Sequence, residues 1–264
     1  MDILAQILIQ FLFRLSFGVA VAMAIVPVQL VSSGFYRIHL WVLMGVNTLA
    51  ALVTYSGRES LAETLASWQF VLVMAIATAV VCYLAAAAWL YERRQTGTVL
   101  LHAVAIASLL NAVLATPWAN RTTGVGISLA MIDLVSGGIL LGATLAAMLL
   151  GHWYLNTPKM ELVPLKRLVA LMACAIAART LLCAVGLTLE VNSSQALSTT
   201  FWIFIAFRWL AGLLGTATMA WLAWLTLRVP NTQSATGILY SGVILAFLGE
   251  LVSQLLSVDL LYPV

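Results

Sequence analysis

The sequence predicts an all-α, polytopic transmembrane helical bundle with about eight spans. Two observations lead to this class: 63% of the 264 residues are hydrophobic and 8% are charged, and the mean hydropathy is +1.07. A soluble domain carries roughly 25% charged residues, so this chain has too few to cover a water-facing surface. Long apolar stretches separated by few turn residues favour helices over a barrel of short alternating strands.

A helix needs about 20 apolar residues to cross the hydrocarbon core. Such runs predict eight spans in one membrane domain, residues 1–264, at Leu4–Leu30, His39–Tyr55, Trp68–Tyr91, Thr98–Thr116, Gly126–Tyr154, Leu165–Thr188, Thr199–Leu227 and Ala235–Ser257. The N-terminus lacks the basic region of a cleaved signal peptide, so we expect the first span to be retained.

Basic residues in the connections predict the orientation. The odd-numbered connections hold most of them, at Arg37, Arg93, Arg94, Lys159, Lys166, Arg167 and Arg228. The even-numbered connections hold Arg58 and Arg121. Basic loops stay in the cytoplasm, so both termini should be periplasmic and the chain should lie in the inner membrane of a bacterium. The basic residues are scattered singly, which argues against a nucleic-acid partner.

A short sequence similarity suggests an internal repeat with halves 1–125 and 126–264. Ala88-Trp89-Leu90 is followed by Thr96-Gly97, and Ala223-Trp224-Leu225 is followed by Thr236-Gly237. Their separation of about four spans would give two four-helix bundles of the same orientation. Chance is the alternative, because membrane helices use Ala, Trp and Leu heavily.

Ionisable residues within the spans are the strongest functional signal. They are Arg14, Asp133, Arg179, Arg208 and Glu250, and Asn111 reaches a similar depth. Counted at about 1.5 Å per residue, all five lie near the midplane or in the outer half. A charge at the bilayer centre costs at least about 2.5–3.5 kcal/mol, so these side chains should face the bundle interior, pair, or line a wet cavity.

Three arginines face two acids in this set, so one guanidinium is in excess. Its partners could be backbone carbonyls, a lipid phosphate, a haem propionate or an oxygen-rich ligand such as a quinone. The charges could instead be internal links between helices, with no ligand.

The histidines and one aromatic segment form a second group of candidates near the cytoplasmic face. His39, His102 and His152 could supply axial ligands to haem b or part of a metal site, or simply bond to head groups and loops. Trp153, Tyr154 and Asn156 could dock a partner protein, although Pro158 could equally just end the fifth span.

Other chemistry is poorly supported. Cys82, Cys174 and Cys183 lie in apolar spans without Cys-x-x-Cys spacing and are interpreted as buried, inert thiols. The chain has no Gly-x-Ser-x-Gly elbow, phosphate-binding loop or His-Glu-x-x-His motif. With loops this short, soluble chemistry would have to come from other subunits.

The layout resembles the membrane-anchor subunits of polysulfide and dimethyl-sulfoxide reductases. Eight spans and outward termini carry the resemblance, together with Gly249-Glu250-Leu251 in the last span and Arg208 in the span before it. The resemblance implies two four-helix bundles and a quinone site toward the outer face.

Three functional hypotheses follow. The leading one is a non-catalytic membrane subunit of a respiratory or electron-transfer complex, in which the intramembrane charges surround a quinone head group or pass protons. Its partners would be the lipid bilayer and the other subunits of the complex. A secondary transporter for a small anion is the second hypothesis, and a b-haem membrane subunit is the third.

Overall fold

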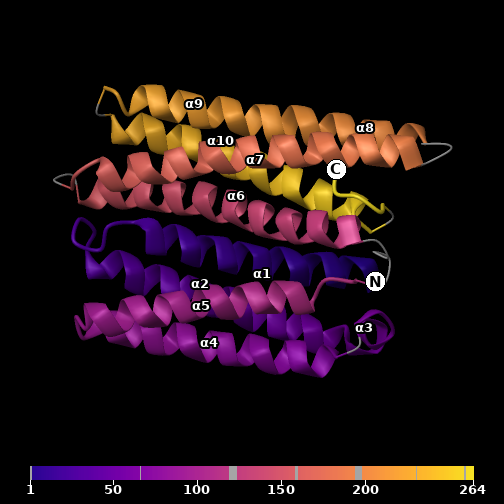
Figure 1. Cartoon of the computed structure of the whole chain (residues 1–264). Helices are drawn as coiled ribbons and strands as arrows, with labels where there is room; N and C mark the ends of the chain where they lie inside the picture. The colour runs from indigo at the N-terminus through magenta and orange to yellow at the C-terminus, as the bar shows by residue number, and fades with distance from the viewer. Residues whose placement is uncertain are drawn as a thin grey trace.

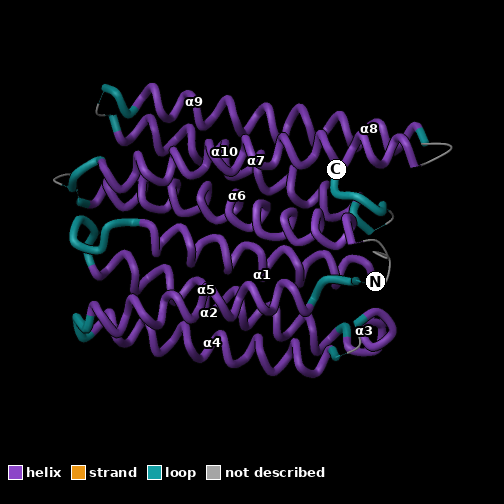
Figure 2. Tube along the Cα trace, viewed as in Figure 1, coloured by secondary structure: helices purple, strands orange, loops and turns teal. Residues whose placement is uncertain are grey.

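The computed structural model describes residues 2–65, 67–118, 124–157, 160–193, 198–229, 231–258 and 260–264. The long helices run side by side, parallel or antiparallel to one another (Figure 1). Within these ranges no strand occurs, and the remaining residues form loops and turns (Figure 2). The predicted all-α class is confirmed.

Eight stretches of the described residues are long and apolar enough to cross a membrane, which confirms the predicted set of spans. Seven are single helices: α1 (Asp2–Ile25), α2 (Ser33–Ser56), α4 (Trp68–Leu90), α5 (Arg94–Leu114), α6 (Gly124–Asn156), α7 (Val163–Ser193) and α10 (Thr232–Leu256). The other is composite: α8 (Thr199–Phe207), the π-helix η1 (Arg208–Gly215) and α9 (Thr216–Thr226).

Some predicted boundaries were wrong. The first span ends at Ile25 rather than Leu30, because Pro27 has no N–H to donate and disfavours a helical residue before it. The second begins at Ser33 rather than His39, and the added turn buries Phe35 and Tyr36. A short helix, α3 (Arg58–Thr64), was not predicted. Arg121, Pro158 and Lys159 lie outside the described residues.

The eight spans pack as two groups of four. In the first group, α1 packs against α2 and α5, and α4 packs against the same two helices. In the second group, α6 packs against α7 and α10, and the composite span packs against those two. The two groups meet mainly where α1 crosses α6. Each group therefore has the same order of neighbours, as expected of two up-and-down four-helix bundles.

The duplicated motif does not have the same surroundings in the two halves. Trp89 is buried, and its ring stacks on Tyr36 with centroids 4.2 Å apart. A Cβ added to Gly97 would lie 2.7 Å from the indole nitrogen of Trp89. In contrast, Trp224 is exposed, and a Cβ on Gly237 would meet nothing within 4 Å. The two similar segments therefore pack differently, and an internal repeat stays a prediction.

Glycines allow α1 and α6 to cross closely. A Cβ on Gly18 would overlap the carbonyl of Gly138, and a Cβ on Gly142 would overlap the backbone of Gly18. Helix association in lipid depends on packing rather than on the hydrophobic effect, and small residues let two backbones approach. This crossing brings the two groups of helices together at the depth of the intramembrane charges.

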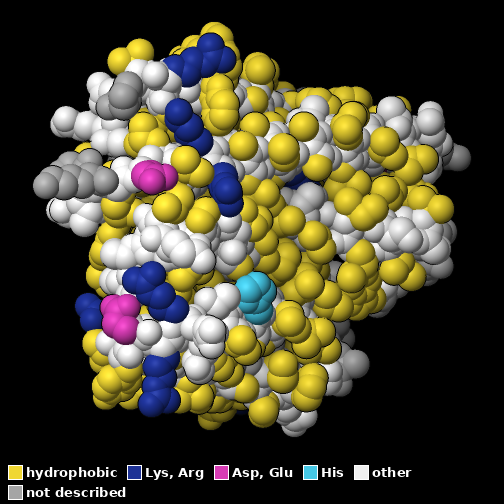
Figure 3. Space-filling view, turned by 60° about the vertical axis from the view of Figure 1, so that its left-hand side comes forward, with side chains coloured by type: hydrophobic (Ala, Val, Ile, Leu, Met, Phe, Trp, Pro, Cys, Tyr) yellow, Lys and Arg dark blue, Asp and Glu magenta, His cyan; other side chains and the backbone are white. Residues whose placement is uncertain are grey.

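The two ends of the bundle differ in charge. Both termini lie at one end (Figure 1). At the other end lie the described basic residues of the odd-numbered connections: Arg37, Arg93, Arg94, Lys166, Arg167 and Arg228. Figure 3 turns this end forward and shows Lys and Arg side chains along it. We refer to it as the basic end.

Candidate functional site

Five intramembrane side chains form one continuous series of ion pairs that begins on α1 in the first group and continues across the second group of helices. We call this series the ion chain; its members in order are Arg14, Asp133, Arg179, Glu250 and Arg208. They come from α1, α6, α7, α10 and η1. Each residue is at most 4% exposed. The expectation that charges from separate helices face inward and pair is thus met by the geometry.

Asp133 joins the two groups of helices. Its Oδ2 accepts a hydrogen bond of 2.8 Å from Nη1 of Arg14, which comes from the first group. Its Oδ1 accepts one from Nη1 of Arg179. Both carboxylate oxygens are therefore bonded to a guanidinium, the geometry in which a buried carboxylate is best compensated.

Glu250 is shared by two arginines. Nε and Nη2 of Arg179 donate to its two oxygens, Oε1 and Oε2, at 3.0 and 2.9 Å. Nη2 of Arg208 donates to the same Oε1 at 2.9 Å. The paired donation from Arg179 is the fork geometry that distinguishes arginine from lysine. Arg179 is thereby bonded through all three of its nitrogens.

Arg208 is the least completely paired member. Its Nε and Nη1 are buried and have no hydrogen-bond partner among the described residues, and Nε of Arg14 is a third such nitrogen. With three guanidinium groups and two carboxylates, the ion chain carries one excess positive charge. Buried charged donors without a partner cost free energy. The arrangement therefore has capacity for an acceptor oxygen or an anion beside Arg208.

Three glycines make room for the ion chain. A Cβ on Gly137 would lie 2.6 Å from Oε2 of Glu250. Gly212 and Gly249 face each other across η1 and α10, and a Cβ on either would come within about 3.1 Å of Nη1 of Arg208. The helix α6 is continuous through Gly137 and its neighbour Gly138.

The seventh span is irregular at the ion chain. The π-helix η1 begins at Arg208 and continues to Gly215 within an otherwise α-helical span. π-Helical turns are rare and occur frequently at functional sites. The sequence contains no proline in this span that would have signalled the change.

Sequence reasoning missed three contacts of the ion chain. Ser253 accepts from Arg179 at 3.2 Å and donates to the main-chain oxygen of Val264 at 3.1 Å. The Sγ of Cys183 lies 3.7 Å from Nη2 of Arg208. Helical spacing was the available signal: Ser253 follows Glu250 by three residues and Cys183 follows Arg179 by four, which places each pair on one face.

Asn111 was predicted at the depth of the charges, but its contact lies in the first group of helices. Its Nδ2 donates to Oγ1 of Thr78 at 3.0 Å. Nearby spans of that group share a second neutral contact set, in which Asn47 donates to Ser16 and Ser16 pairs with Ser108. Apart from Arg14, these buried contacts of the first group are thus neutral, whereas the ion chain in the second group is charged.

The three histidines lie on three helices and differ in exposure. His39 is buried, its Nδ1 lies 2.6 Å from the carbonyl oxygen of Phe35, and its ring packs near Trp153. His102 and His152 are exposed on α5 and α6. Across the part of the chain that the structure describes, no three His, Cys, Asp or Glu side chains form a metal-binding group.

Two of the three proposed docking residues make contacts within the chain. Trp153 donates through its indole N–H to Ser32 at 3.0 Å and packs edge-on against Phe35. Tyr154 is buried and donates to the carbonyl of Glu161. Asn156 alone of the three is exposed. The aromatic pair therefore secures α6 to its neighbours, and partner docking stays a prediction.

The interpretation of the cysteines as buried thiols was wrong for one of them. Cys82 and Cys183 are buried, but Cys174 is exposed. It faces a groove on the outer surface of the second group of helices.

No protein-family model, curated protein or solved structure matches this chain. The function is therefore inferred from the geometry of the chain itself.

Proposed function

We propose that this integral membrane protein is a subunit of a respiratory or electron-transfer complex in the inner membrane, and that its ion chain binds the head group of a quinone. The observation that carries the proposal is Arg208, a fully buried guanidinium with two unpartnered nitrogens beside a shared carboxylate. A scaffold gains nothing from retaining such a group in the bilayer, since removing it would relieve an uncompensated charge.

The donors available match the chemistry of a quinone. Quinone carbonyl oxygens accept hydrogen bonds, and Nε and Nη1 of Arg208 are buried donors without an acceptor. Gln254 lies one turn beyond Glu250 on α10, and neither the nitrogen nor the oxygen of its buried amide has a partner in the described part of the chain. These two side chains would hold and orient the head group, while Glu250 holds Arg208 in place. When bound, the quinone would supply the redox chemistry.

The architecture supports the same proposal. The resemblance to polysulfide and dimethyl-sulfoxide reductase anchors implies two four-helix bundles with a quinone site toward the outer face. Arg208 and Glu250, which carry that resemblance, are bonded to each other here. Glu250 lies within two turns of the end of α10 on the side of the termini, which the charge of the loops predicts to be periplasmic.

Quinone binding provides the direct test. Addition of decylubiquinone to the purified protein in detergent should quench the protein's tryptophan fluorescence in a saturable way. Arg208→Met should weaken this binding at least about 10-fold, because it removes the equivalent of one charge-assisted hydrogen bond. Arg58→Met makes the same change outside the ion chain and should leave binding unchanged. Equal binding by the native protein and Arg208→Met would refute the site.

Association with redox subunits tests the other half of the proposal. The native protein, extracted in mild detergent, should co-purify with a redox subunit, and Glu250→Gln should abolish the quinone-dependent signal of that complex. A chain that never associates with a redox subunit contradicts the proposal. An absorbance spectrum of the same preparation tests the alternative of a b-haem subunit, because bound haem would produce a Soret band.

Transport of a small anion is a second candidate, and one observation favours it. The π-helix begins at Arg208, whose Nε and Nη1 have no partner among the described residues, and transporters place irregular helix segments at substrate sites near the midplane. Proteoliposomes should then take up radiolabelled phosphate, sulfate or acetate saturably, and Arg208→Ala should abolish uptake. Absence of uptake of all three by the native protein removes this candidate.

A further inference from the structure

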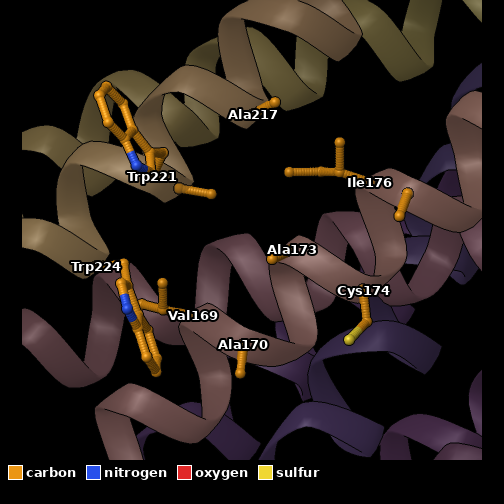
Figure 4. A pocket seen from close by; sticks show the side chains of 10 residues that line it. Val169, Ala170, Ala173, Cys174, Ile176, Ala217, Trp221 and Trp224 are labelled. Atoms are coloured by element: carbon orange, nitrogen blue, oxygen red, sulfur yellow. The ribbon is translucent and has the colours of Figure 1, made fainter.

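An apolar groove separates α7 from α9 on the outer surface of the second group of helices. Its volume is about 520 Å³, within the range of small-molecule sites. Small side chains form its floor, including Ala170, Ala173 and Ala217. Figure 4 shows Trp224 beside Val169 at one end of the groove, and Ala217 and Ile176 toward the other. The groove therefore runs along both helices.

The end of the groove at Trp224 leads to the basic end of the molecule. On α7, Lys166 precedes Ala170 by four residues and Arg167 precedes it by three, so both share its face. On the other side, Arg228 follows Trp224 by four residues, just after α9. Glu161 precedes the start of α7 by two residues and is the acid nearest to Lys166 and Arg167 in sequence. The groove is thus apolar along its length and cationic at its mouth.

We propose that this groove binds an anionic phospholipid, with one acyl chain lying between α7 and α9 and the phosphate held by Lys166, Arg167 and Arg228. Charge complementarity selects this occupant, because a partner helix would fill the apolar part without using the basic mouth. Trp221 and Trp224, 61% and 37% exposed, have rings suited to the level where acyl chains meet head groups. The site is separate from the ion chain, and its test is independent of the quinone proposal.

Native mass spectrometry of the delipidated full-length protein tests the head-group preference. Phosphatidylglycerol and phosphatidylcholine with identical acyl chains serve as probes. We expect the native protein to bind phosphatidylglycerol about 100-fold more tightly, since each basic residue near a membrane surface contributes about a factor of five. Replacing Lys166, Arg167 and Arg228 by Gln should remove this preference. The matched triple Gln variant at Arg37, Arg93 and Arg94 should keep it.

Two further variants locate the acyl chain. Ala173→Trp fills the groove and should lower binding of phosphatidylglycerol at least 10-fold. Ala79→Trp fills a comparable groove of about 370 Å³ between α2 and α4 and should not. Exposed Cys174 lines the first groove, so a fluorophore attached there should be quenched by phosphatidylglycerol with brominated acyl chains more strongly than by brominated phosphatidylcholine.

Three results would overturn this inference. The first is equal affinity of the native protein for the two lipids, and the second is equal loss in the test and control variants. The third is a dimer that disappears in Ala173→Trp but persists in the triple variant at Lys166, Arg167 and Arg228. That last outcome would assign the groove to a second copy of the chain.

Discussion

Glu250→Met is expected to destabilise the protein by about 3–5 kcal/mol, the usual cost of removing one partner of a buried ion pair. The carboxylate of Glu250 accepts three of the hydrogen bonds that guanidinium groups make in the ion chain. Without it, Arg208 keeps only the weak contact to Cys183, and Arg179 depends on Asp133 and Ser253. Unfolding of the detergent-solubilised protein, followed by circular dichroism during titration with SDS, measures the loss.

A second substitution separates charge balance from packing at this position. Glu250→Met alone leaves three guanidinium groups with one carboxylate, whereas Arg208→Met/Glu250→Met leaves two with one and so keeps the excess at a single positive charge. The double variant should therefore recover more than half of the stability lost in Glu250→Met, a non-additive result expected of directly bonded residues. Gln254→Met lies one turn away, removes an amide without partners, and should not destabilise the fold. Additive losses in the double variant would contradict the role assigned to Glu250.

Gly142→Ala is the second change with a large expected effect. The added Cβ would overlap the backbone of Gly18, and backbone atoms cannot yield unless α1 moves away from α6. Overpacking typically costs about 1–3 kcal/mol and occasionally more, and a clash with backbone atoms belongs at the upper end of that range. The same SDS titration should therefore show Gly142→Ala unfolding at clearly lower detergent fraction, or failing to fold during expression.

Gly45→Ala is the matched control, because a Cβ there meets nothing within 4 Å. It removes a flexible residue from the interior of α2 and should stabilise the helix by roughly 0.5–1 kcal/mol. If Gly142→Ala and Gly45→Ala behaved alike, the close crossing of α1 and α6 would not determine how the two groups of helices associate.

The glycine crossing and the ion chain depend on each other. Arg14 precedes Gly18 by four residues, and Asp133 precedes Gly138 by five, so each charge lies about one turn from the crossing. A Cβ on Gly138 would lie 3.0 Å from the carbonyl oxygen of Arg14. Separation of α1 from α6 would therefore lengthen the bond between Arg14 and Asp133. We expect Gly142→Ala to weaken ligand binding at the ion chain as well as stability.

Composition by itself indicated that this protein lies in a lipid bilayer and that its fold is all-α. So few charges and such long apolar runs leave a helical membrane bundle as the stable arrangement, because each helix satisfies its own backbone groups. The depth of Arg14, Asp133, Arg179, Arg208 and Glu250 also followed from counting along the spans, and the cost of a lone charge in lipid predicted that they would pair.

Tertiary structure decided which side chains meet. Which side chains pair depends on how each helix is rotated about its axis. The pattern of apolar residues predicts this rotation poorly here, because the lipid-facing and core-facing surfaces of the helices are similarly hydrophobic. Depth alone thus grouped Asn111 with the charges, although its partner is Thr78. For the same reason the sequence did not predict that two arginines share Glu250, that a π-helix begins at Arg208 or that a groove lies beside Cys174. Each of these features depends on contacts between helices that are distant in sequence.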